Sequence, residues 1–118
     1  MEFIEASAFT RHVHHYLDDD SYSALQAELA ADPERGEMVP GSGGFRKVRW
    51  PDTRRGKGRR GGLRVIYFYF ELEYQIWLMT LYSKNEVADL TSKEKKTLKA
   101  AIDLEAKVRV EKRARRKR

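Results

Sequence analysis

The chain of 118 residues contains no cysteine and no long hydrophobic run. The first absence excludes a disulfide framework and zinc sites built on cysteine thiolates, and it fits a reducing compartment. The second excludes a membrane span, because the longest apolar stretch, residues 65–70, is far too short to cross a bilayer. No basic and then apolar leader follows Met1, so we expect a cytoplasmic protein without a secretory signal or a membrane partner.

Histidine is also scarce, and its placement argues against metal chemistry. The three histidines are His12, His14 and His15. His12 and His15 could share one face of a helix, but no third ligand is evident, so we expect no metal site and no cofactor. The acidic run 18–20 is interpreted as helix caps and dipole partners rather than as Mg²⁺ ligands.

What the chain has in abundance is positive charge, and that charge is unevenly distributed. Residues 45–64 carry nine basic side chains against Asp52, and residues 107–118 carry eight against Glu111. Since the whole chain is only +6, the remainder must be acidic, with a charge of −9. Two basic zones on an acidic body attract polyanions such as nucleic acid.

The hydrophobic pattern predicts strands at residues 3–6, 45–50, 63–70 and 74–83. Residues 71–73 are expected to form the turn of an antiparallel hairpin between the last two strands. A first helix is expected with Ser7 as its N-cap, and a second should end at 32–33, where a proline follows. Residues 33–44 and 51–62 are interpreted as loops. Thr91 and Glu94 have the spacing of a capping box, which predicts a last helix after residue 91.

This order predicts an α+β fold with helices on one face of a mainly antiparallel sheet of three to four strands, whose other face stays partly open. We expect one domain over residues 1–106. Residues 107–118 are interpreted as a flexible basic tail, which could add nonspecific affinity for RNA or bind nothing.

The candidate chemistry lies at one end of the predicted hairpin. Arg64 begins the first hairpin strand, and Tyr82 and Lys84 end the second. A three-residue turn would place all three side chains on one face, whereas a turn of two or four residues would separate them. Tyr82 is the aromatic residue that we expect to stack on a base, because it lies beside the cations. The basic glycine loop before Arg64 could contact phosphates or be a solvated loop.

Several segments, in order, resemble the HigB-type branch of the RelE/ParE toxin superfamily. Leu81-Tyr82-Ser83-Lys84-Asn85-Glu86 and residues 56–67 resemble its core strands, and residues 32–47 resemble its loop and second strand. Residues 17–22 and 25–29 resemble its helical start, and residues 90–98 its last helix. The resemblance covers about residues 3–106 and implies a RelE-like fold with an N-terminal strand, two helices, the sheet and a C-terminal helix.

The resemblance implies a toxin of a type II toxin–antitoxin system, which is a metal-independent endoribonuclease that cuts mRNA in the ribosomal A site. A 2′-hydroxyl would attack the adjacent phosphate and leave a 2′,3′-cyclic phosphate. Arg64 would stabilise that phosphate, Lys84 would assist proton transfer or charge stabilisation, and Tyr82 would orient or stack the nucleotide. The general base is not identified. The residues expected to bind the RNA are Arg46, Lys47, Arg49, Lys57, Arg59 and Arg60.

The implied partners are the ribosome with its mRNA and a cognate antitoxin, a HigA-like helix-turn-helix protein. Three other functions stay open at this point. One is a ParE-like toxin that inhibits DNA gyrase, another is a noncatalytic RNA-binding module, and the last is a degenerate toxin that only pairs with its antitoxin. Cutting of mRNA on ribosomes would distinguish the first interpretation from all three.

Overall fold

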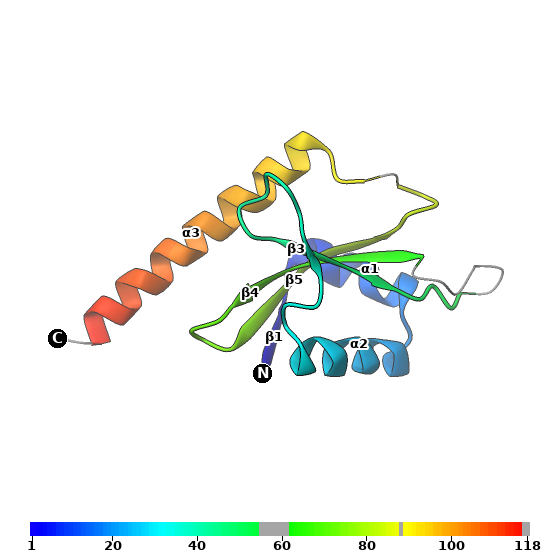
Figure 1. The fold of residues 1–118 in the computed structure, drawn as a ribbon, viewed down its shortest axis with the longest axis horizontal. Coiled ribbons are helices and arrows are strands. Elements are labelled where there is room, and N and C mark those ends of the chain that lie inside the picture. Colours follow the sequence, from blue (N-terminus) through cyan, green and yellow to red (C-terminus); the bar gives the residue numbers. More distant parts are fainter. Residues whose placement is uncertain (55–61, 88, 117–118) are drawn as a thin grey trace.

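The computed structural model describes residues 1–54, 62–87 and 89–116 and confirms the α+β class. Five strands form one mixed sheet in the order β1-β5-β4-β3-β2 (Figure 1). The elements along the chain are β1 (Glu2–Glu5), α1 (Ser7–Tyr16), α2 (Asp19–Ala31), β2 (Glu37–Met38), β3 (Arg46–Trp50), β4 (Leu63–Phe70), β5 (Gln75–Ser83) and α3 (Ser92–Arg116). Within the described residues, no helix combines the length and the apolarity needed to cross a membrane.

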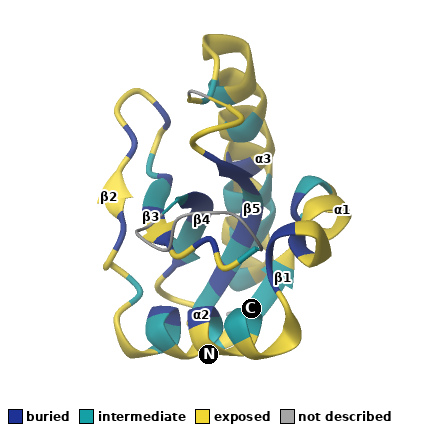
Figure 2. Ribbon diagram, turned by 90° about the vertical axis from the view of Figure 1, so that its right-hand side faces the viewer, coloured by how far each residue is buried: buried dark blue, intermediate teal, exposed yellow. Residues whose placement is uncertain are grey.

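Helices cover both faces of the sheet, so the expectation that they share one face is wrong. The first core cluster joins α1 and α2 to alternate residues of the central strands, among them Val65 and Tyr67. The second joins α3 to the residues between them, including Ile66 and Phe70. Because β4 is apolar on both faces, each face needs a cover, and Figure 2 shows the buried residues concentrated along β4 and β5.

The sheet has five strands rather than three to four, with the predicted N-terminal strand β1 at one edge and an unpredicted strand, β2, at the other. β1 pairs with β5 in parallel, so the sheet is mixed. The short strand β2 lies within the segment that we expected to be a loop, and Glu37 and Met38 pair with Lys47 and Arg46 of β3. A two-residue strand between turns carries no readable alternation, and only its pairing with β3 defines it.

The β4–β5 hairpin departs from the prediction twice. Its turn has four residues rather than three, Phe70 pairs with Gln75, and Tyr74 lies in the turn with φ 50°. A register shift then occurs between Ile66 and Tyr67, which leaves one extra residue in β5. The bulge reverses the effect of the longer turn, so that Arg64 lies directly opposite Tyr82 and the two share a face.

The helix ends follow the sequence signals closely, with two exceptions. The capping box is confirmed, since Thr91 N donates to Glu94 Oε1 (2.9 Å) and Glu94 N to Thr91 Oγ1 (3.1 Å). The prediction that Ser7 caps α1 is wrong, because Ala6 is the N-cap and no side chain caps that end. Beyond residue 106 the chain stays helical to Arg116, so this part of the predicted tail continues α3.

Candidate nucleic-acid interface

α3 covers part of one face of the sheet, and cationic side chains lie on that face beside the part that α3 covers. Lys47 is the cross-strand partner of Ile66, and Arg49 is the partner of Arg64. Cross-strand partners share a face, and Ile66 belongs to the core beneath α3. Lys47, Arg49 and Arg64, with Tyr82 next to Arg64, therefore lie on one surface, which we call the cationic face. Arg49 and Arg64 thus place two guanidinium groups in directly opposed positions of neighbouring strands.

Arg64 is almost completely buried in its strand. It is 7% exposed, and its Nη1 donates to the carbonyl of Leu63 at 3.1 Å. It also has contacts beyond this bond. A buried guanidinium is costly unless it is hydrogen-bonded or meets an anion. Arg49 opposite it is exposed and Lys47 is half-buried, so the cationic face combines one fixed cation with two that can approach a ligand.

Tyr82 is held by an acidic residue that the sequence analysis missed. The Tyr82 hydroxyl donates to Asp89 Oδ1 at 3.1 Å, and the Leu90 N–H donates to the same oxygen at 2.8 Å. Burial, with Asp89 as hydrogen-bond partner, raises the pKa of Tyr82 to about 12. The Leu90 N–H and the Tyr82 hydroxyl lower the pKa of Asp89, with smaller effects from the charges of Lys47 and Lys95. Tyr82 thus stays neutral and Asp89 stays ionised at neutral pH.

The ring of Tyr82 is less available than we expected. The residue is 7% exposed and packs in the core cluster beneath α3. An aromatic side chain so placed offers little area for stacking on a base, and its hydroxyl is the part that faces the polar groups. Tyr82 is therefore better placed to orient a ligand than to stack on it.

Lys84 lies just outside the strand, in the turn that follows β5, and is exposed. Its backbone N–H donates to the carbonyl of Gly62 at 2.9 Å. This bond extends the β4–β5 ladder by one step beyond Leu63 and Ser83. Lys84 is thereby fixed at the same end of the hairpin as Arg64, as the sequence predicts.

Of the other predicted RNA-binding residues, the one that the structure describes, Arg46, does not lie on the cationic face. Arg46 pairs with Tyr67 and so lies on the opposite face of β3. Its Nη1 donates to the carbonyls of Glu34 (3.0 Å) and Gly36 (2.8 Å), which fixes the segment before β2. Lys57, Arg59 and Arg60 lie outside the described residues.

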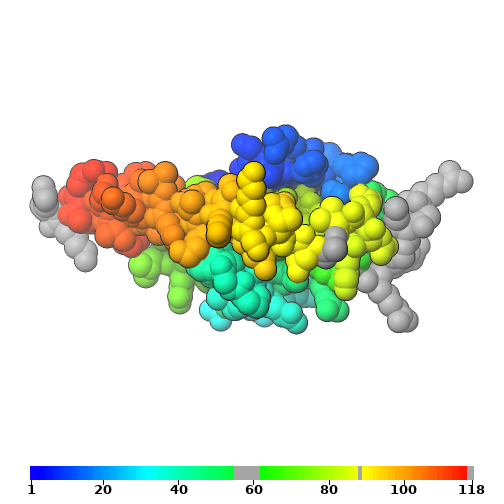
Figure 3. All heavy atoms as spheres, turned by 90° about the horizontal axis from the view of Figure 1, so that it is seen from above, coloured from blue at the N-terminus to red at the C-terminus, as the bar shows by residue number. Residues whose placement is uncertain are grey.

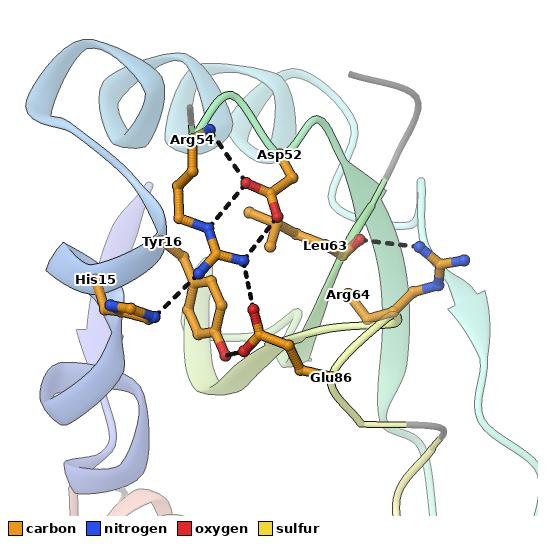
Figure 4. Close-up of polar contacts among 7 residues, drawn as sticks. All are labelled: His15, Tyr16, Asp52, Arg54, Leu63, Arg64 and Glu86. Atoms are coloured by element: carbon orange, nitrogen blue, oxygen red, sulfur yellow. Dashed lines mark hydrogen bonds and ion pairs between the residues drawn. The ribbon is translucent and has the colours of Figure 1, made fainter. Parts of the chain in front are cut away.

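A polar network joins the start of the basic segment to the body of the protein (Figure 4). Arg54 Nε and Nη2 donate to the two carboxylate oxygens of Asp52 at 3.0 and 2.8 Å, and Nη2 also donates to Glu86 Oε1 at 2.8 Å. Arg54 Nη1 lies 3.0 Å from His15 Nε2, and the guanidinium stacks 4.6 Å from the centre of the Tyr16 ring. α1, the strand end and the turn after β5 thus meet at one arginine.

This Arg54 network does not resemble a phosphate site, although it contains a histidine and a glutamate. Its arginine is engaged by two carboxylates, and hydrogen bonding to Asp52 is the main cause that raises the pKa of Arg54. Among the described residues of this network, one guanidinium beside two carboxylates provides no net positive charge to attract an anion. Asp52 is the one acid in the basic segment, and that isolation is the sequence signal that could have revealed the ion pair.

The edge of the cationic face is hollowed. A groove of about 200 Å³ is lined by Arg35, Glu37, Lys47, Val48 and Arg49, where β2 meets β3. In the described part of the chain, no group of three or more histidine, aspartate and glutamate side chains is arranged to hold a metal ion. The arrangement can bind an anion with guanidinium and ammonium groups next to a fixed tyrosine hydroxyl.

Comparison with known proteins places the fold. No family model matches the chain. The structure is similar to the Escherichia coli toxin RelE, solved as a mutant in the free state, with a TM-score of 0.50 and 13% identity over 74% of this chain and 86% of that chain. The intact E. coli RelBE toxin–antitoxin complex matches with a TM-score of 0.49 and 13% identity, over 70% and 94%. The chain therefore has a RelE-like fold.

Proposed function

We propose that this protein is the toxin of a type II toxin–antitoxin pair and that it cuts mRNA on the ribosome. The observation that carries the proposal is the pair of directly opposed arginines, Arg49 and Arg64, on the part of the sheet that α3 leaves uncovered. Guanidinium groups match the geometry of phosphate oxygens, so a phosphate on this face could accept hydrogen bonds from both arginines. The RelE-like fold and the resemblance to HigB-type toxins support the choice of RNA as that ligand.

In the proposed reaction, the 2′-oxygen of the nucleotide before the cut attacks the phosphorus and the bond from phosphorus to the 5′-oxygen breaks. The proton leaves the 2′-hydroxyl and one is delivered to the 5′-oxygen, which gives a 2′,3′-cyclic phosphate and a free 5′-hydroxyl. Arg64 stabilises the extra negative charge on the phosphate oxygens, because its guanidinium is held in place before the substrate arrives. This scheme requires no metal ion.

The other groups act around that phosphate. Lys84, exposed at the end of the hairpin, assists proton transfer or charge stabilisation, and Tyr82 orients the nucleotide through its hydroxyl. Arg49 and Lys47 hold the RNA backbone, together with Lys57, Arg59 and Arg60 of the neighbouring segment. The proposed partners are ribosomes, which place the protein in the cytoplasm, and a HigA-like helix-turn-helix antitoxin that keeps the toxin inactive.

The test is a ribosome assay with purified chain and mRNA, read by primer extension. Wild-type protein should give cuts in the A-site codon, and Arg64→Gln should reduce their rate about 100-fold, the usual effect of removing one charge-stabilising donor. Because Arg64 is buried, replacing it could also destabilise the fold. Arg49→Gln changes an exposed side chain, which should not affect folding, and it should weaken cutting as well.

Arg46→Gln is the matched control, since it removes an arginine from the same strand but from the opposite face. It should retain activity at temperatures where circular dichroism shows it folded. Intact mRNA with wild-type protein would refute the nuclease, and arrest of DNA gyrase in the same extract would favour a ParE-like toxin. Cutting that Arg49→Gln and Arg64→Gln leave unchanged would show that the reaction occurs elsewhere on the molecule.

A further inference from the structure

The last helix is longer than the sheet that it covers. α3 has 25 residues, and at 1.5 Å per residue it is about 37 Å long. Its first half packs on the sheet through Leu98, Ile102 and Ala106. Its second half extends past the sheet to one end of the molecule, as Figures 1 and 3 show. Packing in the core therefore explains the first half of the helix alone.

One arginine clamps the start of this extension to the hairpin. The Arg109 guanidinium lies 3.9 Å from the centre of the Phe70 ring and 5.4 Å from that of Trp77. It also pairs with Glu105 at 3.1 Å, and Arg113 pairs with Glu73 of the hairpin turn at 2.6 Å. These contacts keep the extension helical and fix its direction, and they occupy two of its cations.

The remaining cations of the extension are exposed. Between residues 107 and 116 there are six basic residues against Glu111. Lys107, Lys112, Arg115 and Arg116 are all exposed, and none of them makes an ion pair with another described residue. Lys112, Arg115 and Arg116 are spaced i, i+3 and i+4, which places them side by side on one helix face. Like charges at this spacing destabilise a helix slightly, so stability of the helix does not explain them.

This patch cannot serve the same phosphate as the cationic face. The end of α3 and the beginning of β4, which carries Arg64, lie toward opposite ends of the longest axis of the molecule, which measures 57 Å (Figure 1). A polyanion that touches both must be long, as an RNA is. A membrane surface fits less well, because a membrane-bound amphipathic helix needs an apolar face to insert, and the last turns of α3, residues 111–116, contain charged residues and one alanine.

We propose that Lys112, Arg115 and Arg116 form a second RNA-binding surface, which contacts the backbone of structured or long RNA at a distance from the site of cutting. The inference rests on the proposed function for the choice of RNA over other polyanions. The surface increases affinity for any RNA sequence, because cations on a helix face contact phosphates and not bases.

The salt dependence of binding tests this proposal. The full-length chain and the triple variant Lys112→Gln/Arg115→Gln/Arg116→Gln are titrated against a fluorescent RNA of 60 nucleotides between 0.05 and 0.5 M NaCl. The slope of log affinity against log salt is negative, and each lost phosphate contact reduces its magnitude by about 0.7. Losing three contacts therefore reduces it by about 2. At 0.1 M salt, this change corresponds to an affinity about 100-fold lower.

A charge-conserving variant is the control. Lys112→Arg/Arg115→Lys/Arg116→Lys keeps three cations at the same positions and should keep the wild-type slope, while circular dichroism verifies the helix content of both variants. A triple glutamine variant with an unchanged slope overturns the proposal. If the triple glutamine variant loses binding to vesicles of anionic lipid while its RNA binding is unchanged, the proposal is also overturned, and the surface is one that binds membranes.

The outcome is independent of the nuclease. If the wild type fails to cut mRNA, but the triple glutamine variant has a smaller salt dependence of RNA binding, the proposed function is refuted and the second surface is supported. Protein that cuts mRNA, and whose RNA binding does not respond to the triple variant, supports the proposed function and refutes the second surface.

Discussion

Removing the Arg54 side chain should destabilise the protein more than removing any other ion pair described above. Asp52 is buried, with a side chain 3% exposed, and Arg54 contacts both of its carboxylate oxygens from a side chain that is 19% exposed. Arg54→Met therefore leaves a buried carboxylate without its main counter-charge. Breaking such a pair costs about 3–5 kcal/mol. The backbone N–H of residue 54 still donates to Asp52, and Asp52 has a further contact, so we expect the lower end of this range, about 3 kcal/mol.

Urea unfolding followed by circular dichroism measures this change, and calorimetry provides a second readout. A chain of 118 residues unfolds with an entropy of about 0.25 kcal/mol/K, so a loss of 3 kcal/mol lowers Tm by about 12 °C. The double variant Asp52→Asn/Arg54→Met removes the charge as well as its partner. It should recover roughly 2 kcal/mol of the loss, because the buried negative charge is removed together with the guanidinium that balances it.

Arg35→Met is the matched control. Arg35 pairs with Glu28, but the two side chains are 46% and 44% exposed. An ion pair so exposed contributes less than about 1 kcal/mol, and the variant should unfold close to the wild type. Equal destabilisation by Arg54→Met and Arg35→Met, or a double variant no more stable than Arg54→Met, would refute the reasoning about the buried pair.

Two further predictions concern buried tyrosines. The Tyr67 hydroxyl donates to the Pro33 carbonyl (2.7 Å) and accepts from the Gly36 N–H (2.9 Å), so Tyr67→Phe should lower the free energy of unfolding by about 1–3 kcal/mol in urea; a loss below about 0.5 kcal/mol would contradict this. The pKa of Tyr82 is raised to about 12 from an ordinary value near 10. Its contribution to stability is therefore complete below about pH 10 and disappears as the pH rises through about 12. Between about pH 9 and 12, the free energy of unfolding should therefore decrease less steeply with pH for Tyr82→Phe than for the wild type. Parallel curves for the two proteins would argue against the raised pKa of Tyr82.

The sequence contained enough information for the local elements but not for their assembly. Thr91 and Glu94 predicted the start of α3 because a capping box needs only neighbouring residues. The apolar strand 63–70 was recognised for the same reason. β2 was missed because two residues carry no readable alternation, and the parallel pairing of β1 with β5 was not predicted because it joins residues far apart in the chain. Apolar residues on both faces of β4 were visible in the sequence, and they could have predicted helices on both sides.

The candidate site was predictable in its cations and not in its acids. Arg49, Arg64 and Lys47 were identified from charge and strand position, and the register of β3 with β4 shows them on one face. Alternation along β3 could have excluded Arg46, which follows Phe45 and precedes Lys47, because neighbouring residues of a strand point to opposite faces. Asp89 lies 7 positions from Tyr82, and Arg54 lies 39 positions from His15 and 32 from Glu86, and no spacing rule connects such pairs.

The shared face of Arg64 and Tyr82 depends on two local irregularities that cancel. A four-residue turn alone would put these side chains on opposite faces, and the extra residue of the bulge restores them to one face. Met79 is the residue of β5 without a cross-strand partner, since Leu78 pairs with Tyr67 and Thr80 with Ile66. Deleting Met79 should therefore regularise the ladder and leave Arg64 opposite Tyr82, although the core loses a buried side chain. Backbone NOEs between residues 64 and 82 should persist, and their replacement by NOEs from residue 64 to residue 81 or 83 would contradict the assignment of Met79 as the extra residue of the bulge.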